Sequence, residues 1–158
     1  MSDRYRRFVA GRLGSDRWPT TGGTPEEWYR ERLHIRALVD EMSEADRQLK
    51  AAPLHDSESI ERFHAAFQAL YSPAWERIVR GLQHGEKWAI EPAIVFLEAK
   101  PFCFRSGYAT EDLCVYLSRI PLTANQRNRL RRLVPAALAD PRRQGREKHR
   151  WLRLAESL

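Results

Sequence analysis

The sequence predicts an all-α protein, and three observations lead to that class. Apolar residues recur at helical spacing, capping motifs precede several of the apolar runs, and prolines separate those runs. No alternating strand pattern of any length appears. Because 158 residues suit a single core, we expect an N-terminal arm and loop over residues 1–23 and one helical domain over residues 24–158. That domain would hold six or seven helices, as an irregular bundle or as stacked, HEAT-like pairs.

A buried central helix is predicted over Pro92–Lys100. Ile94–Leu97 are four consecutive apolar residues, whose side chains point all round a helix, so the helix must be enclosed. Proline suits the first position of a helix, and Pro101 stops this one. We expect Phe102–Phe104 to cap the core and Gly107 to let the chain reverse.

Three helices are predicted before the central one. Thr24, Pro25 and Glu27 form a capping box, which predicts a long helix to about Lys50. The later starts and stops are a cap at Asp56 or Ser57, a restart at Ser72-Pro73 and an end near Gly85. A helical stripe over residues 2–13 and a loop over residues 14–23 precede them, and docking of this arm stays open.

Three helices are predicted after the central one. Apolar spacing gives a helix over residues 109–120. Thr123 and Gln126 form a second capping box, which opens a helix that Pro135 should kink. Asp140-Pro141 then has the pattern of the cap and first residue of a last helix.

The net charge of +6 is concentrated toward the C-terminal end. Residues 1–19 carry +3, residues 20–126 carry −4 and residues 127–158 carry +7. On a wheel of the predicted last helix, five arginines fall in one arc opposite its apolar side. They are Arg142, Arg143, Arg146, Arg150 and Arg153, and the preceding helix adds Arg127 and Arg131, with Arg129 and Arg132 more widely spread. Because cations gain nothing at a helix start, we expect this face to bind something negative; a merely solvated charged face is the alternative.

No motif for catalysis or for a bound cofactor is readable. Glu31 with His34 and Glu61 with His64 have the spacing of half a di-iron site, but the wheel turns Glu61 away from the apolar stripe of its helix. No Gly-rich phosphate loop or nucleophile elbow occurs either. We therefore predict no metal, no cofactor and no enzymatic activity. Glu31 falls in an apolar arc, and whether it is buried and paired stays open.

The cysteines and the N-terminus bear on the compartment. Cys103 and Cys114 lie in apolar segments without a partner at metal spacing, so we expect reduced thiols. The N-terminus lacks the apolar core of a signal peptide, and no window approaches the ~20 apolar residues of a membrane span. The sequence therefore predicts a cytoplasmic protein.

One stretch carries a resemblance. F-L-E-A-K-P-F-C-F-R-S-G-Y over residues 96–108, followed by L-T-A-N-Q-R-N-R-L-R-R-L and R-E-K-H-R-W-L-R-L-A, resembles uncharacterised small all-α bacterial proteins that share F-L-E-A-x-P-x-x-F-R-S-G-Y. The resemblance covers residues 96–155 and implies a helical fold. No function is attached to that group, so no activity or site residue comes with it.

Arg105 and Tyr108 stand beside a predicted tight turn and form a candidate anion or peptide contact. Alternatively, Arg105 pairs with a carboxylate such as Glu98, and Tyr108 packs.

The sequence as a whole predicts a non-enzymatic bacterial interaction protein, adaptor or immunity-type, whose basic C-terminal helical face binds an acidic protein partner. The alternative is a helical nucleic-acid-binding protein, favoured by the arginine density and disfavoured by the acidic middle of the chain. The partner and the oligomeric state stay open.

Overall fold

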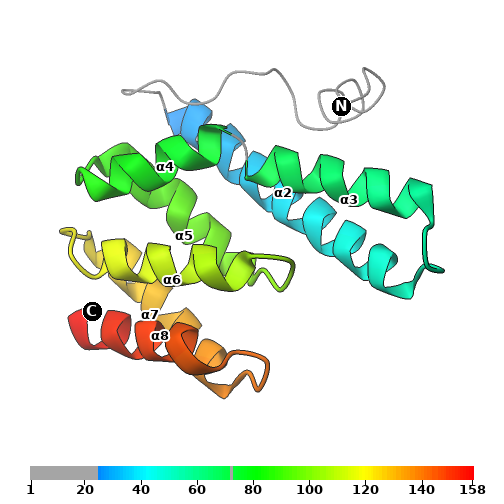
Figure 1. Ribbon diagram of the computed structural model, residues 1–158. Helices are drawn as coiled ribbons and strands as arrows, with labels where there is room; N and C mark the ends of the chain where they lie inside the picture. The colour runs from blue at the N-terminus through cyan, green and yellow to red at the C-terminus, as the bar shows by residue number, and fades with distance from the viewer. Residues whose placement is uncertain (1–24, 72) are drawn as a thin grey trace. The chain divides into compact units, whose positions relative to one another are not determined.

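The computed structural model describes residues 25–71 and 73–158, and the chain divides into two compact units, one up to Glu76 and one from Arg77. The described elements are the helices α2 to α8 and a short 3-10 turn, η1, with no strand among these residues (Figure 1). The predicted all-α class is therefore confirmed. The single helical domain over residues 24–158 remains a prediction. The predicted arm and loop, and the cap at Thr24, lie outside the described residues.

A helical hairpin of α2 (Pro25–Ala51) and α3 (Ser57–Leu70) forms most of the first unit (Figure 1). Asp56 caps α3 as predicted, because its side chain accepts a hydrogen bond from the Ser59 N–H at 3.0 Å. Arg62 of α3 donates two hydrogen bonds to Glu41 of α2, at 2.9 and 3.2 Å, and one to Gln48 at 2.6 Å. These bonds tie the two helices of the hairpin together.

An aromatic row runs along α3 into α4 (Pro73–Gln83), which starts at the predicted proline. The ring centroids of Phe63 and Phe67 are 6.4 Å apart, those of Phe67 and Tyr71 5.0 Å, and those of Tyr71 and Trp75 6.0 Å. Glu61 is exposed, as the helical wheel predicted. The side chain of Glu31 lies outside the described residues.

Gly81 lets α4 pack closely on η1 (Lys87–Ala89) in the second unit. A Cβ atom at Gly81 would lie 2.8 Å from Trp88 Cζ2 and 2.9 Å from Ala89 Cβ, which is closer than side chains tolerate. Gly85 follows with a φ of 71° and ends α4 near the predicted position.

The central helix α5 (Ile90–Glu98) is enclosed, as predicted. Its residues Ile94–Leu97 are at most 3% exposed. The helix starts two residues before Pro92, which occupies the first turn, where a missing N–H leaves no bond unmade. Arg129 links α7 to this helix. Its guanidinium donates hydrogen bonds to Glu98 at 2.7 and 2.8 Å and to Glu91 at 2.6 Å.

The remaining helices are α6 (Ser106–Leu117), α7 (Ala124–Ala139) and α8 (Gly145–Ser157), and α8 packs against both α6 and α7 (Figure 1). The capping box before α7 is confirmed: Thr123 Oγ1 accepts from the Gln126 N–H at 3.3 Å, and Gln126 Oε1 accepts from the Thr123 N–H at 2.9 Å. α7 continues through Pro135. The predicted start of α6 at residue 109 is three residues late, and the predicted start of α8 at Asp140-Pro141 is wrong.

Among the described residues, none of the helices combines the length and the apolar run that crossing a bilayer requires.

Candidate functional site

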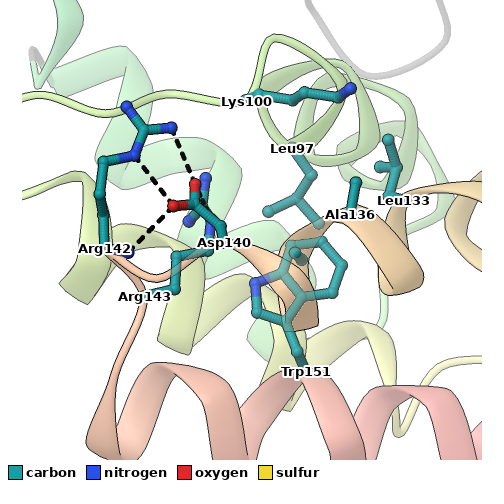
Figure 2. Close-up of a pocket in the computed structure, with 9 residues that line it drawn as sticks. Leu97, Lys100, Leu133, Ala136, Asp140, Arg142, Arg143 and Trp151 are labelled. Atoms are coloured by element: carbon teal, nitrogen blue, oxygen red, sulfur yellow. Dashed lines mark hydrogen bonds and ion pairs between the residues drawn. The ribbon is translucent and has the colours of Figure 1, made fainter.

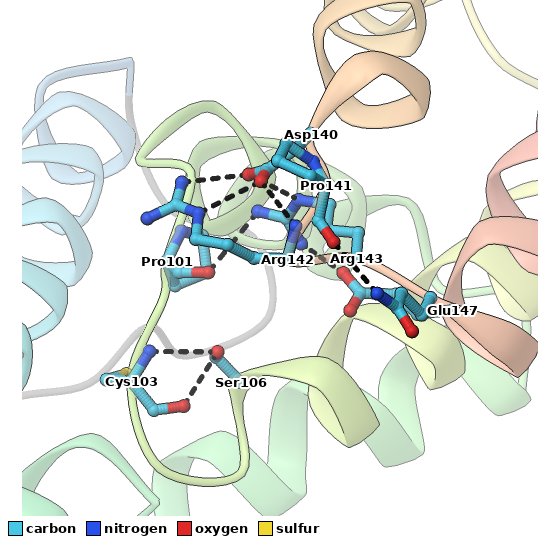
Figure 3. Close-up of polar contacts among 9 residues, drawn as sticks. Pro101, Cys103, Ser106, Asp140, Pro141, Arg142, Arg143 and Glu147 are labelled. Atoms are coloured by element: carbon cyan, nitrogen blue, oxygen red, sulfur yellow. Dashed lines mark hydrogen bonds and ion pairs between the residues drawn. The ribbon is translucent and has the colours of Figure 1, made fainter.

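The turn between α7 and α8 contains two of the arginines that the sequence placed on the last helix. Asp140 ends α7 and α8 begins only at Gly145, so Arg142 and Arg143 precede the helix instead of lying in its first turn. Asp140 Oδ1 accepts from the backbone N–H of Arg142 at 3.0 Å and from its Nε at 2.9 Å, and Oδ2 accepts from Nη2 at 2.8 Å (Figure 3). The hydrogen bond from the Arg142 side chain, above all, lowers the pKa of Asp140 to about 2.

Arg143 is enclosed, with only 6% of the residue exposed. Its guanidinium forms an ion pair with Glu147, lies 3.6 Å from Asp140 Oδ2 and donates to the carbonyl of Pro101 at 3.3 Å (Figure 3). It therefore links the end of α7, the first turns of α8 and the segment after α5. The predicted position of Arg143 on a solvent-facing arc is wrong, because that arc assumed a helix four residues longer.

The segment after α5 has a fixed backbone. Lys100 and Arg105 both adopt a positive φ, of 50° and 62°. Ser106 Oγ accepts from the Cys103 N–H at 3.1 Å and donates to the Cys103 carbonyl at 2.8 Å (Figure 3). These bonds hold the turn that precedes α6, which starts at Ser106 without a side-chain cap. The reversal expected at Gly107 is instead made at Arg105.

Gly107 has a different role from the predicted one. It lies inside α6, and a Cβ atom there would sit 3.3 Å from Glu147 Oε2 of α8. A glycine at this position therefore lets α8 and its ion-paired glutamate approach α6.

Aromatic side chains from the same segment are exposed. Phe102 is 45% exposed, Phe104 53% and Tyr108 67%. The predicted capping of the core by Phe102 and Phe104 is therefore wrong, and so is the packed alternative for Tyr108. The Arg142 guanidinium lies over the Phe102 ring, 4.1 Å from its centroid. We call Phe102, Phe104, Arg105, Tyr108 and Arg142 the aromatic–arginine surface.

Arg105 contributes an exposed cation to this surface. The pairing with Glu98 that the sequence suggested does not occur, since both Glu98 oxygens accept from Arg129. Arg105 forms no ion pair with a residue in the described part of the second unit.

The other predicted arginines are spread over the second unit. On α8, Arg146 lies 3.3 Å from Glu111 of α6, Arg153 lies 3.4 Å from Glu156, and Arg150 is half-buried near Asp112. On α7, Arg127 donates to the Leu122 carbonyl at 2.6 Å, and Arg131 to the Leu158 carbonyl and to Asn128. The predicted arginine face is therefore confirmed in part, because Arg146, Arg150 and Arg153 lie on one side of α8. Nearby carboxylates compensate much of the charge of these arginines.

Cys114 does not have the environment of a reactive thiol. It is buried, and burial raises the pKa of its thiol well above the usual range. Cys103 is half-buried, and its backbone is held by Ser106.

The chain matches no protein-family model, and comparisons with curated proteins and with solved structures give no match. The likeness to small all-α bacterial proteins therefore stays an expectation from the sequence.

Sequence reasoning missed Phe102 and Phe104 as surface residues. A usable signal was present: Pro101 ends the buried helix, so the aromatic residues that follow need not continue its core. The positive φ of Arg105, which follows these residues, is not predicted by any residue pattern.

Proposed function

We propose that this chain is a non-enzymatic interaction protein that binds an acidic segment of a protein partner through the aromatic–arginine surface. The observation that supports this most directly is the exposure of three aromatic side chains within seven residues, beside two arginines. Aromatic residues and arginine are the types most enriched at the energetic centres of protein interfaces.

Burial in the described fold contributes little for Tyr108, which is 67% exposed. Full burial of a large apolar side chain is worth about 1.5–3 kcal/mol, and Tyr108 forgoes much of that gain. The backbone that presents the exposed rings is fixed by the Ser106 bonds and by the positive φ of Arg105. A partner that covers these rings would therefore bind a surface already in place, which lowers the ordering cost of association.

The sign of the charge supports an acidic partner. Residues 77–158 contain 16 Lys and Arg against 8 Asp and Glu, a net charge of +8. Arg105 is exposed at the surface, and Arg142 remains 55% exposed although it pairs with Asp140. A carboxylate on the partner would pair with these guanidiniums in bidentate geometry.

Nucleic-acid binding is the second candidate, and the same net charge of +8 favours it. It predicts a different behaviour: affinity for an arbitrary duplex should fall steeply with salt, because each phosphate contact releases a counterion.

Two matched double variants test the proposal. Arg105→Asn/Tyr108→Ala removes one arginine and one exposed ring from the surface; asparagine is chosen because it tolerates the positive φ. Arg153→Asn/Leu152→Ala removes one arginine and one exposed apolar residue from the outer face of α8. Neither set is buried, so both variants should keep the wild-type melting temperature.

The partner is captured on immobilised wild-type protein from bacterial extract with and without nuclease, and its affinity for each variant is then measured by calorimetry. The surface variant should weaken binding at least about tenfold, while the α8 variant should bind like the wild type. Equal binding by both variants would contradict the proposal, and capture that vanishes with nuclease would favour nucleic acid.

A further inference from the structure

The two units of the chain carry opposite net charges. Residues 25–76 contain 6 Lys and Arg against 11 Asp and Glu, a net charge of −5, whereas residues 77–158 carry +8. Opposite charges on two parts of one chain favour association between copies, because each part attracts the oppositely charged part of a neighbour. The chain itself therefore contains candidates for the acidic segment that the aromatic–arginine surface binds.

The turn between α2 and α3, at the end of the helical hairpin, is both acidic and apolar (Figure 1). Leu54 is 90% exposed, the largest exposed fraction of any large apolar side chain that the structure describes. Ile60 is 36% exposed, and Glu58 and Glu61 are exposed as well. No lysine or arginine occurs from residue 51 to residue 61. We call Leu54, Glu58, Ile60 and Glu61 the hairpin tip.

The glutamates of the hairpin tip carry charge that the described fold does not compensate. Neither Glu58 nor Glu61 forms an ion pair with a residue that the structure describes. Arg62, which follows Glu61 in the sequence, pairs with Glu41 of α2 at 2.9 Å. Both carboxylates are therefore available to the cations of a partner.

Hydrogen bonds also fix the backbone of the hairpin tip. The Asp56 N–H donates to the Pro53 carbonyl at 3.2 Å, and the Asp56 side chain accepts from the Ser59 N–H at 3.0 Å. His55, inside this turn, has a positive φ of 70°. The exposed Leu54 is thus presented by an ordered turn, which lowers the ordering cost of an association.

The aromatic–arginine surface complements the hairpin tip in charge and in polarity. Figure 2 shows Asp140 bonded to two side-chain nitrogens of Arg142, while the third nitrogen points away from that carboxylate. This third nitrogen and the exposed Arg105 guanidinium can both donate to carboxylates of a partner. Phe102 and Tyr108, 45% and 67% exposed, offer ring surface that an aliphatic side chain can cover.

We infer that the hairpin tip of one copy binds the aromatic–arginine surface of a second copy, so that the chain associates with itself. Leu54 packs on the exposed rings, and the two glutamates of the tip pair with Arg105 and Arg142. The contact joins two different surfaces, so it closes as a reciprocal pair or continues as a row of copies. The inference rests on the proposed function, because it names the acidic segment that the same surface binds.

Sedimentation equilibrium of the full chain measures this self-association in the wild type and in three variants. The tip variant is Leu54→Ser/Glu61→Gln, and the surface variant is the one that replaces an arginine and a tyrosine in the capture experiment. The control variant, Leu152→Ser/Glu156→Gln, removes the same two residue types from exposed positions on α8. All the changed residues are exposed, so each variant should keep the wild-type melting temperature.

The wild type and the control variant should associate as the protein concentration rises. Added salt should weaken this association, because the charges that meet are exposed. The tip variant and the surface variant should each associate at least about tenfold more weakly. A mixture of these two variants should form a one-to-one complex, since the tip variant keeps its surface and the surface variant keeps its tip.

The outcomes separate self-association from the proposed function. A wild type that stays monomeric at millimolar concentration would overturn the second copy as the partner, while binding of another acidic protein is tested by capture and calorimetry. Equal weakening in the control variant would show a general surface effect and would overturn the inference. A mixture of the tip and surface variants that stays monomeric would overturn it too, because the two intact surfaces would then not bind each other.

Discussion

Replacing Arg143 with alanine should destabilise the protein strongly. The side chain is 6% exposed and forms ion pairs with Asp140 and Glu147, whose side chains are 15% and 12% exposed. Alanine would leave the Glu147 carboxylate enclosed without its cation and the Pro101 carbonyl without its donor. Removal of one partner from a buried ion pair costs about 3–5 kcal/mol, because the remaining charge stays desolvated. In a chain of this size that corresponds to a melting temperature lower by about 6–20 °C.

Urea unfolding followed by circular dichroism measures this loss, and Arg153→Ala is the control. Arg153 and Glu156 are 66% and 68% exposed, so their pair should contribute less than about 1 kcal/mol. Arg143→Met/Glu147→Leu removes both charges and should recover part of the stability lost in Arg143→Ala. If Arg143→Ala unfolds within about 1 kcal/mol of the wild type, the ion-pair account of this turn is refuted.

Three further predictions concern packing, pH and thiol reactivity. Gly81→Ala should destabilise the protein although alanine favours helices, because the new Cβ would lie 2.8 Å from Trp88 Cζ2; a gain in melting temperature would contradict the close packing. Asp140 has a pKa of about 2 when folded and about 3.9 when unfolded, so its contribution is complete above about pH 4 and is lost as the pH falls toward 2. Asp140→Asn should remove that part of the acid dependence, which urea midpoints at several pH values would show. Alkylation followed by mass spectrometry should label Cys103 before Cys114, because burial keeps the latter thiol protonated.

Local chemistry made much of the fold predictable. The caps at Asp56 and Thr123 depend on a side chain and a backbone N–H three residues away, so the sequence alone predicts them. The enclosed helix around Phe96 is equally local, since consecutive apolar residues leave no polar side for water.

The candidate site was harder to predict because its geometry comes from distant partners. Asp140-Pro141 has the pattern of a helix start, yet the Asp140 side chain bonds back to Arg142 and Arg143 turns inward to Glu147 and the Pro101 carbonyl. The wheel then placed Arg143 in solvent. The positive φ of Arg105 is likewise not predicted by any residue pattern in the sequence.

Amide signals of the ¹⁵N-labelled chain show where an acidic protein segment binds, and so whether it binds the aromatic–arginine surface. The probes are a short peptide of glutamate pairs separated by leucines, the same peptide with glutamine in place of glutamate, and a short DNA duplex. The acidic peptide should shift the signals of Phe102, Phe104, Arg105 and Tyr108, and the glutamine peptide should not. Shifts confined to the outer face of α8, or produced by the duplex alone, would contradict binding of acidic segments at the aromatic–arginine surface.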